Sequence, residues 1–251
     1  GHGKTAAEPK VQGTTRGFRD WFDSEGLARQ LQLAGYHTAM ISPFGQRHAA
    51  HHFYAGFNEI HNTGKGGMES AEEVMPVVTR WFDDHAGDDN WYMHINFWDI
   101  HTPYRAPMEY GNKFEDDPVP PHIVDAWKRH ENKTGPHSPK DPGMYGDDKP
   151  EQWPRLPKRI DSEDNLKQYI DGYDTAIRYV DDQIKWMLDK LKAEGVYDDT
   201  VVIISADHGE NQGELGIFGE HGTADQATCN IPMIVTWPGC AGASCAPGAR
   251  T

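Results

Sequence analysis

The sequence predicts an α/β fold in which a mostly parallel central sheet is flanked by helices. Short apolar runs, typical of strands, alternate along the chain with longer segments of helical periodicity. This alternation is typical of a doubly wound sheet. The 251 residues, 37% of them hydrophobic, suffice for one large domain with a buried core. Ligands of such sheets bind at the carboxyl ends of the strands, so the residues that follow each strand are the first candidates for a site.

Four apolar runs are predicted to form the strands. Each is short, rich in β-branched or aromatic side chains, and set apart from its neighbours by polar or turn-forming residues. The predicted strands span residues 37–41, 91–98, 201–205 and 231–237. We expect all four to be buried.

Two helices are predicted before the second strand. Ser24 can cap a helix that ends at Gly35. Ser70 and Glu73 have the spacing of a capping box, and apolar residues follow at helical spacing, namely Val74, Val77, Val78 and Trp81. Pro76 is expected to move the start of this helix by about one turn.

The third helix has the clearest pattern, and a long irregular segment precedes it. One apolar stripe consists of Ile170, Tyr173, Ile177, Val180, Ile184, Met187 and Leu191, and Gly195 ends the helix. Residues 104–164 are rich in proline and charge and show no periodicity. Long segments of this kind usually serve as lids or binding loops, so we expect a loop insertion in a single domain that spans residues 1–251.

Charge and composition exclude several classes of protein. Asp and Glu number 39 against 24 Lys and Arg, a net charge of -15 that disfavours nucleic acid and anionic membranes as partners. No stretch approaches the roughly 18 apolar residues of a membrane span. Three cysteines exclude a disulfide scaffold, and Cys240 and Cys245 can either pair or remain free thiols. Fourteen histidines favour an enzyme, because histidine serves as ligand, base and anion donor.

Two strand ends carry residues suited to catalysis. Asp207 and His208 follow the strand 201–205, where an acidic residue beside a histidine suits a metal or phosphate-type site. The alternative is an aspartate that caps a turn beside an exposed histidine. His101 follows the strand 91–98 and can hold an oxyanion or protonate a leaving oxygen, or it can be a surface histidine in a tight turn. His94, inside that strand, is predicted to be a core histidine.

Two further segments can reach the same edge of the sheet. Arg47 and His48 come soon after the first strand, and the planar guanidinium suits sulfate, phosphate or carboxylate. A solvated basic turn is the alternative. His221 lies in the glycine-flanked segment before the last strand.

In order and spacing, these motifs resemble the sulfatase family of the alkaline phosphatase superfamily over about residues 35–239. Residues 35–39 are similar to its GY-x-TA strand entry, and residues 101–104 to its H-x-P-Y/F turn. Residues 201–210 are similar to its SDHGE segment, and residues 231–239 to its last strand. The resemblance implies an alkaline-phosphatase-like sandwich.

The resemblance also implies roles for the candidate residues. Asp207 and His208 would complete a divalent metal site, usually calcium in sulfatases. His101 would contact the sulfate or the bridging ester oxygen, and His221 lies near where relatives place a lysine or histidine on the sulfate. Calcium prefers oxygen ligands, whereas related phosphonate and phosphodiester hydrolases carry the same Asp-His pair with manganese or zinc.

Two departures from the family pattern affect the site. Residues 42–45 replace the GKWH of the family, so Arg47 or His48 is expected to bind substrate in its place. The N-terminal part of the family pattern is missing: no Asp-Asp pair follows a first strand, and no C-x-P-S-R or S-x-P-S-R nucleophile segment occurs. Residues 245–250 resemble that signature but have one residue too many, and we interpret them as a loop. We therefore expect this chain to be the central part of a longer polypeptide, without the nucleophile segment and the C-terminal subdomain.

Three functions follow from this interpretation. The first is hydrolysis of a sulfuric ester, on a sulfated small molecule or glycan, by a formylglycine whose residue lies outside this chain. The second is hydrolysis of a phosphonate monoester or phosphodiester on the same fold. The third is a non-catalytic binding fragment, whose uncovered sheet edges would favour aggregation. The resemblance favours a periplasmic or extracellular location, although the sequence shows no signal peptide.

Overall fold

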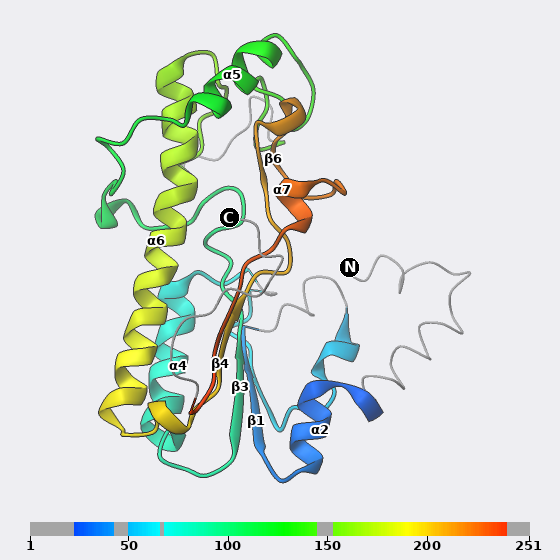
Figure 1. Cartoon of the computed structure of the whole chain (residues 1–251), viewed down its shortest axis with the longest axis vertical. Helices are drawn as coiled ribbons and strands as arrows, with labels where there is room; N and C mark the ends of the chain where they lie inside the picture. Colours follow the sequence, from blue (N-terminus) through cyan, green and yellow to red (C-terminus); the bar gives the residue numbers. More distant parts are fainter. Residues whose placement is uncertain (1–22, 43–49, 66–67, 145–152, 240–251) are drawn as a thin grey trace, which may run out of the picture.

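The computed structural model describes residues 23–42, 50–65, 68–144 and 153–239. Its centre is a parallel sheet of three strands in the order β2-β1-β3, with bounds β1 (His37–Ile41), β2 (Glu59–His61) and β3 (Trp91–Ile95). Helices cover this sheet, which confirms the predicted α/β fold (Figure 1). β1 is aligned with β3 from the His37–Trp91 pair to the Ile41–Ile95 pair, so their carboxyl ends coincide.

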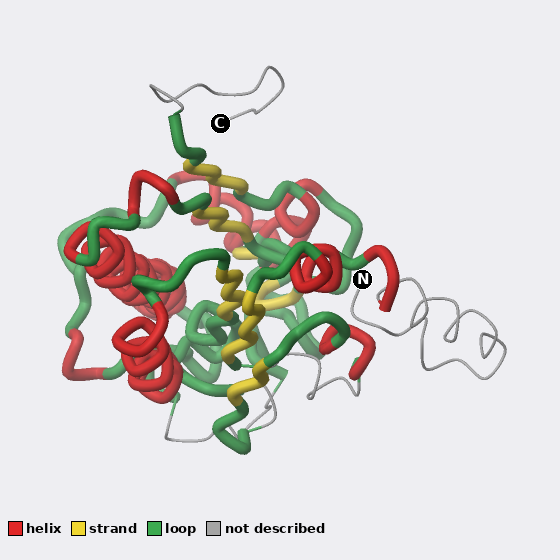
Figure 2. The backbone as a smooth tube through the Cα atoms, turned by 90° about the horizontal axis from the view of Figure 1, so that it is seen from below, coloured by secondary structure: helices red, strands yellow, loops and turns green. Residues whose placement is uncertain are grey.

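Two antiparallel pairs accompany this sheet. β4 (Val202–Ser205) pairs with β7 (Met233–Thr236), and in both views this pair lies alongside the three-stranded sheet (Figures 1 and 2). β5 (Asn211–Gln212) pairs with β6 (Phe218–Glu220). The expected mostly parallel sheet is therefore parallel in β2-β1-β3 and antiparallel where β7 joins β4.

Helices lie on both sides of the strands. α4 (Ala71–His85) and α6 (Glu163–Ala193) lie together on one side, and α2 (Leu27–Leu33) lies on the other (Figures 1 and 2). α4 begins directly after Ser70, whose N–H donates to the Glu73 carboxylate at 3.0 Å. The expected shift of its start was wrong, because Pro76 is accommodated inside the helix. Val74 and Val78 are fully buried against β1 in one apolar cluster.

α6 begins before the apolar stripe that predicted it. Ser162 caps its first turn, where the hydroxyl accepts the Asn165 N–H at 3.2 Å. The acidic residues Glu163 and Asp164 occupy this turn, where they interact favourably with the helix dipole. These polar residues obscured the start of the helix, because the apolar pattern begins only with the next turn.

Replacement of Ser162 by alanine is expected to lower the free energy of unfolding by about 1 kcal/mol, because the first turn loses its side-chain cap. Chemical denaturation measures the change. Ser162→Asp keeps an acceptor and is the matched control, expected to remain within about 0.5 kcal/mol of the wild type. Equal losses in both variants would contradict the capping role.

The segment 104–164 contains a helix that the sequence analysis missed. α5 (Pro121–His130) buries one face, and the Trp127 Nε1–H donates to the Ile160 carbonyl at 3.0 Å. Proline at the first helical position is a start signal. The surrounding prolines and charges obscured it. Part of the predicted loop insertion is thus a helix that packs into the hydrophobic core.

The prediction that all four strands are buried is confirmed for β1 alone, because β3 is half-buried and β4 and β7 are largely exposed. Ile203 of β4 is 55% exposed, and Met233 and Val235 of β7 are 69% and 47% exposed. Apolar composition identified both strands, but it did not reveal that their side chains are left exposed by the described part of the chain. Arg47, His48, Cys240 and Cys245 lie outside the described residues.

Candidate active site

Three histidines from three separate strand ends meet in one place. His101 follows β3, His208 follows β4, and His221 follows β6. One ring nitrogen of each lies within 4.8 Å of those of the other two. The rings of His208 and His221 stack with their centroids 3.9 Å apart, and those of His101 and His221 are 5.0 Å apart. The fold thus gathers side chains separated by more than a hundred residues.

Hydrogen bonds to the backbone orient two of these rings. The Nδ1–H of His101 donates to the Thr102 carbonyl at 2.7 Å, and the Nδ1–H of His208 donates to the Gly209 carbonyl at 2.8 Å. A carbonyl only accepts, so Nδ1 carries the proton in both rings. In the neutral rings Nε2 keeps its lone pair, available for a metal ion or a proton.

Asp207 lies at the edge of the histidine group. Its Oδ1 is 3.7 Å from His208 Nε2, and its side chain is 60% exposed. The segment after Asp207 is held against residues 227–228, because the Gly209 N–H donates to the Thr228 carbonyl at 2.9 Å. A Cβ at position 209 would lie 2.0 Å from the Ala227 carbonyl oxygen, so only glycine fits there. The close packing at Gly209 therefore fixes the backbone directly after Asp207 and His208.

A buried carboxylate connects the loops that carry His101 and His208. Glu210 accepts the hydroxyl hydrogens of Thr102 and Tyr104, at 2.9 and 2.7 Å. Burial raises the pKa of Glu210. Sequence reasoning assigned this residue no role, although a carboxylate directly after the Asp-His-Gly run was the available signal. Glu210 fixes the position of the turn that bears His101.

A second buried carboxylate joins the His101 loop to α4. Asp99 is fully buried and accepts the Ala71 N–H, at 2.9 Å to Oδ2 and 3.2 Å to Oδ1. Burial raises its pKa from 3.8 to about 6, opposed by the hydrogen bond from Ala71. The loop is therefore held at both of its ends.

The raised pKa of Asp99 predicts a pH dependence of stability. The folded state binds the proton more tightly than the unfolded chain, so this group contributes most below about pH 4 and its contribution falls until about pH 6. Asp99→Asn removes the charge and keeps an oxygen acceptor. Relative to the wild type, its free energy of unfolding is expected to rise by roughly 3 kcal/mol between pH 4 and pH 7.

Urea denaturation at several pH values measures this change. The exposed Asp198→Asn is the matched control and should follow the wild-type curve at every pH. If Asp99→Asn also follows the wild-type curve, Asp99 does not titrate in this range.

The loop that carries His221 is held by a separate network. Asn211 Nδ2 donates to Thr223 Oγ1 at 2.9 Å and to Asp225 Oδ2 at 3.2 Å. Glu220 accepts the His221 N–H at 2.8 Å and lies 2.8 Å from His137 Nε2. His137 belongs to the predicted loop insertion, so that insertion supports the site.

The prediction for His94 was wrong. This histidine was expected in the core, but it is exposed on β3.

The converging set consists of three imidazoles with one carboxylate beside them. Such nitrogen-rich donors suit zinc or manganese better than calcium, which prefers oxygen.

Comparison with known proteins decides the family. The model of the family described as Sulfatase matches residues 8–244. The chain belongs to the sulfatase family. A choline-sulfatase from Rhizobium meliloti is 26% identical over 195 residues, which cover 74% of this chain and 35% of that protein. A sulfatase from Formosa agariphila is 25% identical over 187 residues, 70% of this chain and 34% of that protein.

Solved structures show the same fold. The structure of BT4656 in complex with its substrate, D-glucosamine-2-N,6-O-disulfate, has a TM-score of 0.61 at 16% identity and covers 86% of this chain and 56% of that one. A phosphonate monoester hydrolase from Silicibacter pomeroyi has a TM-score of 0.58 at 19% identity, covering 88% of this chain and 54% of that one. The sulfatase-family chain thus spans about a third of its curated relatives and about half of these structures.

A shorter match connects the sulfatase-family chain to a membrane protein. The inner membrane protein YejM of Salmonella typhimurium is 34% identical over 77 residues, 30% of this chain and 12% of that protein. Among the described residues of this chain, no helix has the length and apolar character that crossing a membrane requires.

Proposed function

We propose that the protein containing this chain hydrolyses sulfuric esters. The observation that carries the proposal is the convergence of His101, His208 and His221 within 4.8 Å, at the strand ends of a sulfatase-family fold. Three imidazoles at one point, two of them with Nε2 turned away from their backbone hydrogen bonds, suit a tetrahedral anion and the leaving oxygen of its ester.

Asp207 and His208 are the residues proposed to hold a divalent metal ion. The exposed Asp207 carboxylate and His208 Nε2 lie 3.7 Å apart, and a carboxylate oxygen with a ring nitrogen is a donor pair that fits such an ion. Calcium is the usual ion of the family, and zinc or manganese would suit the nitrogen donor better. When bound, the ion would neutralise charge on the oxygens of the ester. Metal analysis of the purified protein tests which ion is present.

The remaining residues have separate proposed roles. In its imidazolium form, His101 donates the Nε2–H proton to the departing ester oxygen, while its Nδ1–H stays on the Thr102 carbonyl. His221, stacked on His208, binds a sulfate oxygen. Arg47 and His48 are proposed to bind the substrate, by the sequence argument alone. The nucleophile, a formylglycine, is proposed to come from a segment outside this chain.

The proposed substrate is a sulfated small molecule, with a sulfated carbohydrate favoured. The BT4656 structure holds a disulfated glucosamine, and the choline-sulfatase relative makes choline sulfate the comparison substrate. Sulfate release by the full-length protein, matured for formylglycine, should occur on one of these classes. No release from sugar, choline or aryl sulfates would overturn the proposal. The family resemblance favours a periplasmic or extracellular location.

A phosphonate monoester or phosphodiester hydrolase is the second candidate. The nitrogen-rich donor set and the likeness to the Silicibacter pomeroyi enzyme favour it. Parallel measurement of kcat/KM on a sulfate ester and a phosphodiester distinguishes the two candidates. If the full-length protein binds a sulfated glycan and turns over neither ester, the third interpretation, a binding fragment, is correct.

A further inference from the structure

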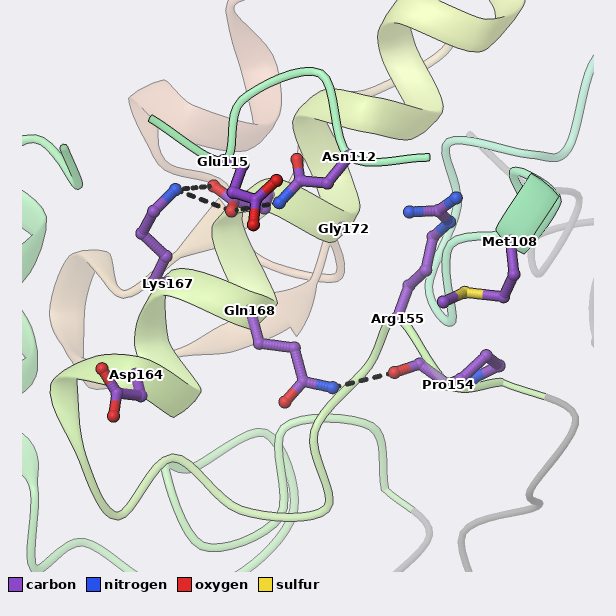
Figure 3. Close-up of a pocket in the computed structure, with 10 residues that line it drawn as sticks. Met108, Asn112, Glu115, Pro154, Arg155, Asp164, Lys167, Gln168 and Gly172 are labelled. Carbon is purple, nitrogen blue, oxygen red and sulfur yellow. Dashed lines mark hydrogen bonds and ion pairs between the residues drawn. The ribbon is translucent and has the colours of Figure 1, made fainter. Parts of the chain in front are cut away.

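A cavity of about 420 Å³ lies against α6 and shares no described residue with the histidine group. Figure 3 shows its wall, with Arg155 on one side and Lys167 on the other, and with Asn112 and Glu115 between them. Its residues come from α6, from the segment 108–115 and from residues 154–155. A space of this size accommodates a small organic molecule.

Arg155 is the unusual group in this wall. Its side chain is buried, with the residue 7% exposed. Its Nε donates to the Ala106 carbonyl at 2.7 Å, and one terminal nitrogen, Nη2, donates to the carbonyls of Pro107 and Gly111. Among the described residues no carboxylate forms an ion pair with it. Burial lowers the pKa of Arg155, and the negative charge of Glu109 opposes this shift only in part.

The other cation of the wall is already neutralised. Lys167 Nζ lies 2.7 Å from both carboxylate oxygens of Asp171, and Asn112 Nδ2 also donates to that carboxylate at 2.7 Å. Asp171 is therefore occupied, and Arg155 is the cation that remains to bind an anion. The second terminal nitrogen of Arg155, Nη1, makes no hydrogen bond to the described part of the chain and can donate to a ligand.

The backbone around Arg155 is held rigidly against α6. A Cβ at Gly172 would lie 2.8 Å from the Arg155 carbonyl oxygen and 3.2 Å from the Tyr104 ring. This glycine therefore permits the close approach that fixes Arg155 in the wall. A cation fixed in this way loses little conformational entropy when an anion binds.

Two carboxylates restrict which anion can enter. Glu115 and Asp164 line the same cavity, are exposed, and form no ion pair with the described residues. They repel polyanions such as nucleic acid or heavily sulfated chains. A ligand with one anionic group and one ammonium group can pair its anionic group with Arg155 and its ammonium group with a carboxylate of the cavity.

We propose that this cavity is a second binding site, for a small zwitterion whose oxyanion binds Arg155 and whose ammonium group faces Glu115, which lies between Arg155 and Lys167 in Figure 3. The oxyanion, a sulfonate, sulfate or carboxylate, accepts charge-assisted hydrogen bonds from the guanidinium. The proposal does not depend on ester hydrolysis, since none of these residues belongs to the histidine group.

Calorimetric titration of the full-length protein with taurine and with isethionate tests the proposal. Taurine carries a sulfonate and an ammonium group, and isethionate replaces the ammonium group with a hydroxyl. Taurine should bind, and about two- to fivefold more tightly than isethionate, because the exposed Glu115 carboxylate contributes modestly. The variant Glu115→Gln should abolish that preference. Absence of taurine binding to the wild type overturns the proposal.

Two variants place the ligand in this cavity. Arg155→Met should weaken taurine at least about tenfold, because a charge-assisted hydrogen bond is lost. Gln168→Trp should weaken it similarly by filling the cavity, without touching Arg155. The control Lys185→Trp, at an exposed position of α6 outside the cavity, should bind normally, as should His101→Ala. Unchanged affinity in Gln168→Trp, or lost affinity in His101→Ala, overturns the location.

Discussion

Replacement of His101 by alanine in the full-length protein is expected to lower kcat by about 10²- to 10⁴-fold on sulfate esters of ordinary alcohols. The physical reason is that a sugar or alkyl alkoxide is a poor leaving group and needs a proton as the ester bond breaks. A nitrophenyl sulfate leaves without such help, so the same variant should retain most of its activity on that ester. The loss should therefore grow with the pKa of the leaving alcohol.

A series of esters with leaving groups of increasing pKa measures this dependence. The matched control is His122→Ala, an exposed histidine of α5, which should leave every rate unchanged. An equal loss on all esters would contradict the proton-donor role and would indicate that His101 binds the sulfate instead.

The strands β1 and β3 were predictable because each is a run of consecutive, mostly apolar residues. The predicted strand 37–41 coincides with β1, which lies between two partners and is largely buried. The predicted strand 91–98 was three residues too long, since β3 ends at Ile95. β2 was missed, because Glu59–His61 has no apolar run and its pairing depends on β1, far away in sequence.

The convergence of His101 and His208 at this candidate site was predictable from the strand ends, whereas the groups that hold their loops were not. His101 and His208 follow predicted strands, and the carboxyl ends of neighbouring strands meet. The role of Glu210 depends on Thr102 and Tyr104, which lie 108 and 106 residues away in sequence. No local pattern specifies such partners, because only the folded chain brings them together.

Replacement of Glu210 by alanine is expected to lower the free energy of unfolding by about 2–4 kcal/mol. The hydroxyl of Tyr104, a residue that is only 1% exposed, would lose its hydrogen-bond acceptor, and the Thr102 hydroxyl would lose its acceptor as well. A buried hydroxyl without a partner bears its full desolvation cost. The surface control Glu194→Ala should change the stability by less than about 0.5 kcal/mol.

A double-mutant cycle with Tyr104→Phe separates this network from simple cavity formation. If the hydrogen bond at 2.7 Å carries part of the loss, Tyr104→Phe should cost less in the Glu210→Ala background than in the wild type. Additive losses would contradict the coupling. Glu210→Ala should also reduce kcat more than it changes KM. The turn that carries His101 would lose its hydrogen bonds to Glu210, while the contacts to the substrate would remain. A fall in stability with unchanged kcat would mean that Glu210 supports the fold and not the position of His101.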